Sequence, residues 1–298
     1  MTTSRRQVLL LALGATLVRA AERLPANKNV RWALGANLWN SFPRVPFTDI
    51  LDVMRETGFI GIRVTQFPQI LTTYNITAAD LERECARRGV HVVTISFNGP
   101  TDDPAQHAQV IERARAAMQF LKRFDARHLV VFSPRRNPNP GAFEAMCKCF
   151  NQIGETAGEM GFQAGLHNHL NQIVQNPEEI DRCMEMTDPK LFHFSPDTAH
   201  VHLAGGDVAA TLNKHRARLM MADYKDAKRA GLDPAKYAPN TYDLGDGEID
   251  FSACHRVLKS IDFKGWLCVD LDIARNGPRA SYERCGAYVV RALEPIYA

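Results

Sequence analysis

Short apolar runs in the C-terminal half of this chain each stop at a polar, mostly acidic residue. The runs and their ends are Phe162–Leu166 before His167, Leu191–Pro196 before Asp197, Leu219–Ala222 before Asp223, and Trp266–Val269 before Asp270. Short apolar runs separated by helix-length segments are typical of buried parallel strands. Polar residues at the carboxyl ends of such strands lie where α/β barrels keep their active sites. Three carboxylates and an imidazole at one barrel mouth would need a divalent cation to hold them, so the pattern indicates a metal-dependent enzyme.

The same strand-and-helix rhythm runs through the whole chain. Eight strands are predicted, at Arg31–Leu38, Ile60–Thr65, His91–Phe97, His128–Ser133, Phe162–His167, Leu191–Asp197, Leu219–Tyr224 and Trp266–Asp270. Amphipathic stretches separate them. Right-handed crossovers between parallel strands close naturally at eight, so residues 25–298 are predicted to form a single (β/α)8 TIM barrel of the α/β class.

The first 24 residues are predicted to be an export signal rather than part of the barrel. The segment Ser4–Leu10 contains Arg5-Arg6 and resembles a twin-arginine signal, and small residues precede a plausible cleavage site at Ala21. The apolar stretch Val8–Val18 is too short for a membrane span, which needs about 20 residues. We therefore expect a periplasmic protein without a membrane anchor after signal removal. The alternative is a disordered N-terminus with a chance arginine pair.

Charge and cysteine content exclude several classes of protein. The formal net charge is +3, and the first twenty residues hold three arginines and no acid, so the remainder is electrically balanced. A balanced surface gives no support to nucleic-acid binding. The seven cysteines are odd in number and show no paired framework, so we predict neither a zinc ribbon nor an essential disulfide.

Alternation along a strand predicts which polar residues point into the barrel mouth together. Residues two apart in a strand share a face. The pairs that do so here are His167 and His169, Asp223 and Lys225, and Asp270 and Asp272. If the first member of each pair points inward, the second points the same way one step further out. Asn168 and Asp226 then point sideways.

Five motifs in register carry a resemblance to a known family. They are Asp197-Thr198-Ala199-His200, Leu203–Asp207, Asp223-Tyr224-Lys225-Asp226, Leu244–Phe251, and Gly265-Trp266 leading into Asp270-Leu271-Asp272. Their order is similar to that of the xylose-isomerase-like TIM-barrel superfamily, which includes sugar isomerases, epimerases and inosose dehydratase. The inosose dehydratase branch is the closer resemblance over residues 165–273, and Gly35–Asn40 resembles its opening strand.

The resemblance implies one divalent metal ion held at the ends of the fifth to eighth strands. The family usually supplies Glu, Asp, His and Glu; the corresponding residues here are His167, Asp197, Asp223 and Asp270. Both sets contain three carboxylates and one imidazole, so the charge offered to the ion is unchanged. A mixed oxygen and nitrogen set suits Mn²⁺, Mg²⁺ or Co²⁺, and zinc is a further option.

The resemblance also implies a reaction and roles for the flanking residues. The expected chemistry is proton abstraction α to a carbonyl on a sugar or keto-polyol, which leads to isomerisation, epimerisation or dehydration. Lys225 would bind or polarise the substrate oxygen, and His169 and His200 are candidate acid/base groups. Substrate contacts are expected from Asn37, Trp39, Asn98 and Asp272.

Two other functions are compatible with the same barrel. An endonuclease-like branch would use several zinc ions, but it needs more histidine ligands and a basic face, which the balanced charge does not offer. A barrel that has lost its metal and binds sugar only would keep the fold without catalysis. For either sugar function, export and the lack of a glycine-rich phosphate loop favour free sugars, with Arg135-Arg136 as the only obvious anion site.

Overall fold

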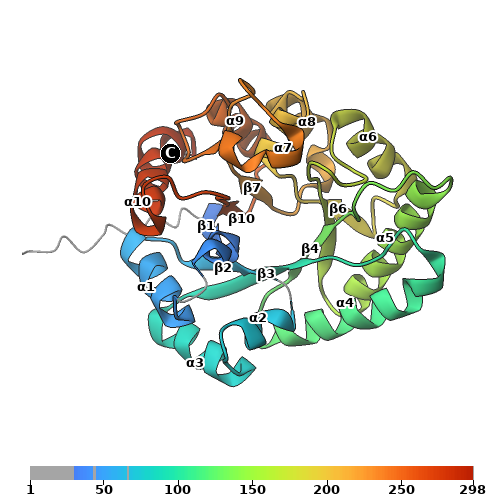
Figure 1. The fold of residues 1–298 in the computed structure, drawn as a ribbon, viewed down its shortest axis with the longest axis horizontal. Helices are drawn as coiled ribbons and strands as arrows, with labels where there is room; N and C mark the ends of the chain where they lie inside the picture. The colour runs from blue at the N-terminus through green and yellow to red at the C-terminus, as the bar shows by residue number, and fades with distance from the viewer. Residues whose placement is uncertain (1–29, 43–44, 66, 298) are drawn as a thin grey trace, which may run out of the picture.

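The computed structural model describes residues 30–42, 45–65 and 67–297, and its strands form a ring surrounded by helices (Figure 1). Eight parallel strands follow one another in the order β6-β5-β4-β3-β2-β1-β10-β7. Their bounds are β1 Val30–Gly35, β2 Gly61–Val64, β3 His91–Phe97, β4 His128–Phe132, β5 Gln163–His167, β6 Phe192–Phe194, β7 Ala222–Tyr224 and β10 Gly265–Val269. The predicted TIM barrel is confirmed.

Strands β6 and β7, at the two ends of this order, face each other and nearly close the barrel. Isolated parallel bridges join Phe194 to Leu219 and Asp197 to Asp223. The amide of Asp223 donates to the carbonyl of Pro196 at 2.8 Å, and the amide of Met220 donates to that of Phe194 at 3.0 Å. The seam therefore closes at the level of two of the predicted metal ligands.

Helices cover the outside of the barrel. They are α1 Phe47–Thr57, α2 Gln69–Thr73, α3 Ala78–Arg88, α4 His107–Lys122, α5 Ala142–Glu159, α6 Pro177–Met186, α7 Thr198–Leu203, α8 Val208–Lys214, α9 Phe251–Ser260, α10 Pro278–Tyr288 and α11 Glu294–Tyr297. Two of these helices begin at well-formed caps. Thr77 and Asp80 form a capping box at α3, and Pro177 occupies the first turn of α6 behind the cap Asn176.

The first strand is shorter than predicted. It ends at Gly35, and the next six residues, Ala36–Ser41, form a 3-10 helix instead of continuing to Leu38. The close approach of Asp270 explains the glycine, since a Cβ at Gly35 would collide with Oδ1 of Asp270. Alternating apolar residues alone do not reveal that the backbone must turn away from this carboxylate.

The long segment after β7, residues 226–247, is folded back on the barrel rather than free. Within it, β8 (Asp226–Ala227) pairs antiparallel with β9 (Thr241–Tyr242). All seven cysteines are free and buried. No helix in the described part of the chain is long and apolar enough to cross a membrane. The predicted export signal, residues 1–24, lies outside the described residues.

Candidate active site

Three aspartates from two strand ends gather around one buried lysine at the barrel mouth. The Nζ atom of Lys225 lies 3.1 Å from Asp197 Oδ2, 2.7 Å from Asp270 Oδ2 and 3.0 Å from Asp272 Oδ2. Lys225 and Asp197 are buried, and Asp272 is partly exposed. Burial opposes the charged ammonium, but the surrounding carboxylates raise the pKa of Lys225 well above its ordinary value. Lys225 is therefore a fixed positive charge.

His167, Asp197 and Asp223 form the part of this cluster that fits a metal ion. One ligand atom from each lies within 4.8 Å of the others. Nδ1 of His167 is 3.2 Å from Asp223 Oδ2, and neither this nitrogen nor Asp223 Oδ1 has a hydrogen-bond partner among the described residues. Buried polar atoms without partners are costly unless a ligand satisfies them. The donor set of one nitrogen and two carboxylates suits a divalent cation.

The protonation states of these groups reflect burial among competing charges. Burial raises the pKa of Asp223 to about 7 and that of Asp197 to about 6. Burial lowers the pKa of His167 to about 3, so its imidazole is neutral at pH 7 and has a lone pair to offer. A divalent cation would favour the ionised form of both carboxylates.

Asp270, the fourth predicted ligand, lies outside this three-residue group. Its Oδ2 contacts Lys225, and its Oδ1 is 2.9 Å from Nη2 of Arg63. Burial favours its neutral form, but the two cations more than offset this and hold its pKa below its ordinary value. Asp270 is thus an ionised carboxylate with a cation on each side.

Arg63 is a member of the site that the sequence patterns did not single out. It lies on β2, is 3% exposed, and also places Nη1 2.8 Å from Asp223 Oδ2. The available signal was a charged residue inside the apolar run Ile60–Thr65, since arginine is almost never fully buried unless paired. Its partners come from β7 and β10, so only the closed barrel reveals the pairing.

The predicted acid/base residues lie beside a pocket at the barrel mouth. A cavity of 580 Å³ is lined by Arg135, Arg136, His169, Leu170, Asn171, Gln172, Ala235 and Tyr237. The ring of His169 lies 3.8 Å from that of His200, and Tyr237 reaches Nε2 of His169 at 3.1 Å. His200 is fully buried behind His169, and its Nε2 points toward Asp197 Oδ2 at 3.8 Å. Tyr237, from the long segment after β7, is a second residue that sequence reasoning missed.

The predicted substrate-binding residues are dispersed. Asn37 reaches the cluster, with Nδ2 3.4 Å from Asp272 Oδ1 and 3.3 Å from the carbonyl of Leu271. Trp39 is buried and stacks on Tyr282, with ring centroids 5.4 Å apart. Asn98 follows β3, and its carbonyl accepts a hydrogen bond from Arg113. Of these three residues, Asn37 is therefore the one that contacts the charged cluster.

The two residues predicted to point sideways do so and hold the site together. Asn168 accepts from the amide of Asp197 at 3.0 Å, and so ties the end of β5 to the end of β6. The buried carboxylate of Asp226 accepts from the amides of Ala227, Gly245, Gly247 and Ile249. Asp226 therefore fixes the far end of the segment that carries Tyr237.

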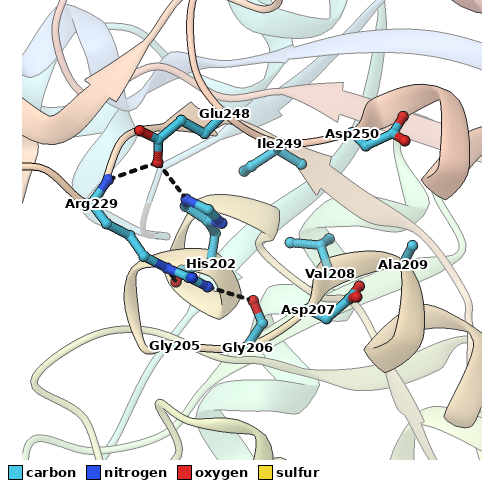
Figure 2. Close-up of a pocket in the computed structure, with 10 residues that line it drawn as sticks. All are labelled: His202, Gly205, Gly206, Asp207, Val208, Ala209, Arg229, Glu248, Ile249 and Asp250. Carbon is cyan, nitrogen blue, oxygen red and sulfur yellow. Dashed lines mark hydrogen bonds and ion pairs between the residues drawn. The ribbon is translucent and has the colours of Figure 1, made fainter.

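A second pocket, of 330 Å³, lies where that segment meets α7 (Figure 2). His202 Nε2 and the amide of Arg229 both reach Glu248 Oε2, at 3.2 and 3.1 Å. The Arg229 guanidinium donates to the carbonyls of His202 and Gly206. These contacts fasten both ends of the segment to the helix that also carries His200.

Comparisons with known proteins show the family and the fold to which the chain belongs. The family model described as a xylose isomerase-like TIM barrel matches residues 51–285. Inosose dehydratase from Salmonella typhimurium is 29% identical over 251 residues, covering 76% of this chain and 81% of its own length. Inosose dehydratase from Lactiplantibacillus plantarum is 24% identical over 273 residues, covering 83% and 90%.

Solved structures share the fold at low sequence identity. The IolI protein, described with a binding zinc atom, gives a TM-score of 0.75 at 13% identity and covers 90% of this chain and 99% of its own. The structure of L-ribulose 3-epimerase gives 0.71 at 16% identity, covering 90% and 96%. At these identities the likeness concerns the barrel alone.

Proposed function

We propose that this chain, which belongs to the xylose isomerase-like TIM-barrel family, is a divalent-metal-dependent isomerase, epimerase or dehydratase of sugars or keto-polyols. The observation that carries the proposal is the convergence of buried ligand atoms from His167, Asp197 and Asp223 beside a fixed lysine charge and a histidine-lined pocket. Relatives named inosose dehydratase and a structural neighbour named L-ribulose 3-epimerase support sugar-modifying chemistry.

His167, Asp197 and Asp223 are the residues that would hold the ion. A divalent cation bound there would polarise a substrate carbonyl and stabilise the negative charge that develops when the α proton leaves. Mn²⁺, Mg²⁺ and Co²⁺ suit the mixed donor set, and the zinc named for the IolI structure keeps zinc as an option.

We assign removal of the substrate's α proton to His169. Its Nδ1 is 2.6 Å from the carbonyl of Leu170, which can only accept, so the ring proton is on Nδ1 and the basic lone pair is on Nε2, where it accepts from the Tyr237 hydroxyl. Burial lowers the pKa of His169 to about 4, which keeps the ring neutral at pH 7. His169 lines the pocket whereas His200 is fully buried behind it, so His169 is the better placed of the two to meet substrate.

Lys225 would bind the substrate oxygen on which charge develops. Its ammonium is held by three aspartates, so the charge is already in place and need not reorganise during the reaction. Asp272, the most exposed of those three, would accept from a substrate hydroxyl. We further propose that the enzyme acts in the periplasm on free sugars or keto-glycosides, as the twin-arginine-like start of the sequence favours.

Solvent exchange tests the reaction directly. The Mn²⁺-loaded protein is incubated with keto-inositol or with 3-keto-glucosides in D₂O, and deuterium at the carbon next to the carbonyl is measured by mass spectrometry and NMR. Incorporation that stops on addition of a chelator is the expected result. Absence of exchange with both classes of substrate would contradict proton abstraction α to a carbonyl.

A metal-free sugar-binding barrel is the second candidate, because Arg63 and Lys225 already offset part of the carboxylate charge. Metal content of purified protein separates the two. Asp197→Asn should greatly lower bound metal and activity together. Asp181→Asn, on the outer helix α6 where Asp181 pairs with Lys214 and His215, should lower neither. Equal metal content in wild type and Asp197→Asn would favour the metal-free binder.

A further inference from the structure

Arg63 links the two carboxylates that flank the barrel mouth on the β7 and β10 side. Its two terminal nitrogens make separate contacts, Nη1 with Asp223 Oδ2 at 2.8 Å and Nη2 with Asp270 Oδ1 at 2.9 Å. All three side chains are at most 3% exposed. A guanidinium stays charged at any working pH, so this contact is permanent.

We propose that Arg63 is a positioning residue that withdraws Asp270 from the metal, so that the ion is held by His167, Asp197 and Asp223 alone. This inference rests on the proposed metal-dependent function. It assigns Asp270 to the anchoring of Arg63 and Lys225 rather than to coordination.

The surroundings of Asp270 support this assignment. Each of its oxygens already faces a cation, Oδ1 toward Arg63 and Oδ2 toward Lys225. On a third side the backbone of Gly35 approaches so closely that a Cβ there would collide with the carboxylate. By contrast, Asp223 and Asp197 each meet one cation, through Oδ2 in both cases. One ligand atom from each of them and from His167 lies within 4.8 Å of the others, in a group that does not include Asp270. A carboxylate wedged between two cations and a glycine has little freedom to turn toward an ion.

The charge of the cluster points to the same division of roles. Asp197, Asp223, Asp270 and Asp272 supply four negative charges when ionised, and Arg63 and Lys225 supply two positive charges. The excess of two negative charges equals the charge of one divalent cation. Without Arg63 the cluster would hold an additional uncompensated carboxylate, which is expensive to bury.

Binding of Mn²⁺ to the purified full chain tests the assignment, with free Mn²⁺ counted by electron paramagnetic resonance. Asp197→Asn and Asp270→Asn should both raise the dissociation constant for Mn²⁺. We expect the increase to be about tenfold or more smaller for Asp270→Asn than for Asp197→Asn. In an Arg63→Met background, Asp270 is released toward the ion, so Asp270→Asn should then cost about tenfold more affinity than it does in wild type. Arg63→Lys keeps the charge without the two-sided contact and should give an intermediate cost.

The outcomes separate the two levels of the proposal. Failure of wild type to bind Mn²⁺ would overturn the metal site and the role of Arg63 together. If Asp270→Asn and Asp197→Asn weaken Mn²⁺ binding equally, only the proposed role of Arg63 is overturned. Circular dichroism reports folding of every variant. If Arg63→Met does not fold, the comparison of Asp270→Asn with Asp197→Asn in the otherwise native chain still decides.

Discussion

Tyr237 donates its hydroxyl proton to Nε2 of His169 across 3.1 Å. The direction follows from the other ring nitrogen, because Nδ1 of His169 donates to the carbonyl of Leu170 at 2.6 Å. Tyr237 belongs to the segment after β7 and His169 to the end of β5. The segment therefore holds the proposed base in one tautomer and at one orientation.

His169→Gln should abolish most α-proton exchange while metal binding is retained. Loss of a positioned general base typically costs about 100-fold or more in rate. Tyr237→Phe should lower the exchange rate less, because the ring stays neutral without its donor. Tyr242→Phe serves as the control, since Tyr242 lies in the same segment and packs against Lys228 and Arg275. Exchange at the wild-type rate in His169→Gln would exclude His169 as the base.

Asp226→Asn should loosen the segment that carries Tyr237. The carboxylate accepts hydrogen bonds from four backbone amides while buried, and an amide side chain can match only part of them. We expect a loss of about 2 kcal/mol in the free energy of unfolding and faster proteolysis between residues 228 and 248. Asp233→Asn, an exposed cap in the same segment, should be nearly neutral by comparison. Unchanged proteolysis in Asp226→Asn would show that the segment is held by other contacts.

His255 should make the protein sensitive to mild acid. This buried ring stacks on Trp32 and contacts the Tyr224 hydroxyl at 3.2 Å, and burial lowers its pKa to about 4. The unfolded chain binds its proton near pH 6.5, so stability is full above that pH and is lost as the pH falls toward 4. The loss from this one group is up to about 3 kcal/mol.

Urea denaturation over a series of pH values checks this expectation. His255→Gln removes the titrating group, so its stability should fall less steeply between pH 6.5 and 4 than that of wild type. The exposed His91 offers the matched control, and His91→Gln should keep the wild-type slope. Parallel slopes for wild type and His255→Gln would assign the acid sensitivity to other histidines.

The effects of substitutions at His167 and Asp223 on Mn²⁺ affinity should be coupled. His167 stands where the family usually has Glu, and Asp223 where it usually has His. His167→Glu and Asp223→His each change the ligand charge and should each weaken Mn²⁺ binding. The double variant restores three carboxylates and one imidazole and should bind better than either single one. Because Nδ1 of His167 lies 3.2 Å from Asp223 Oδ2, a coupling free energy of about 0.5–3 kcal/mol is expected. Affinities that simply add across the cycle would mean that at least one of the two is not a ligand.

The sequence was most informative where local patterns decide the structure. Apolar runs ending at His167, Asp197, Asp223 and Asp270 located four strand ends, and alternation placed Lys225 beside them. These features follow from burial and from the two-residue period of a strand. The same patterns also separated the inward residues from Asn168 and Asp226, which the structure shows bonded to neighbouring backbone.

Local sequence patterns did not predict the residues whose contacts span the barrel. Arg63 lies in an apolar run on β2, and its partners are more than 150 positions away in the sequence. Tyr237 lies in an irregular segment with no period, and its contact with His169 depends on the way Asp226 and Arg229 fold that segment back. Such pairings are set by barrel closure, which a linear pattern does not encode.

The seam between β6 and β7 is where the ring of strands is completed, and Asp197 and Asp223 form one of its two isolated bridges. Each of these residues belongs to a different end of the sheet order. Any cation that both carboxylates share therefore also joins the two ends of the sheet, β6 and β7, and so stabilises the closed barrel. Loss of such an ion would therefore favour local opening of the barrel between β6 and β7, and its effect would extend well beyond the reacting atoms.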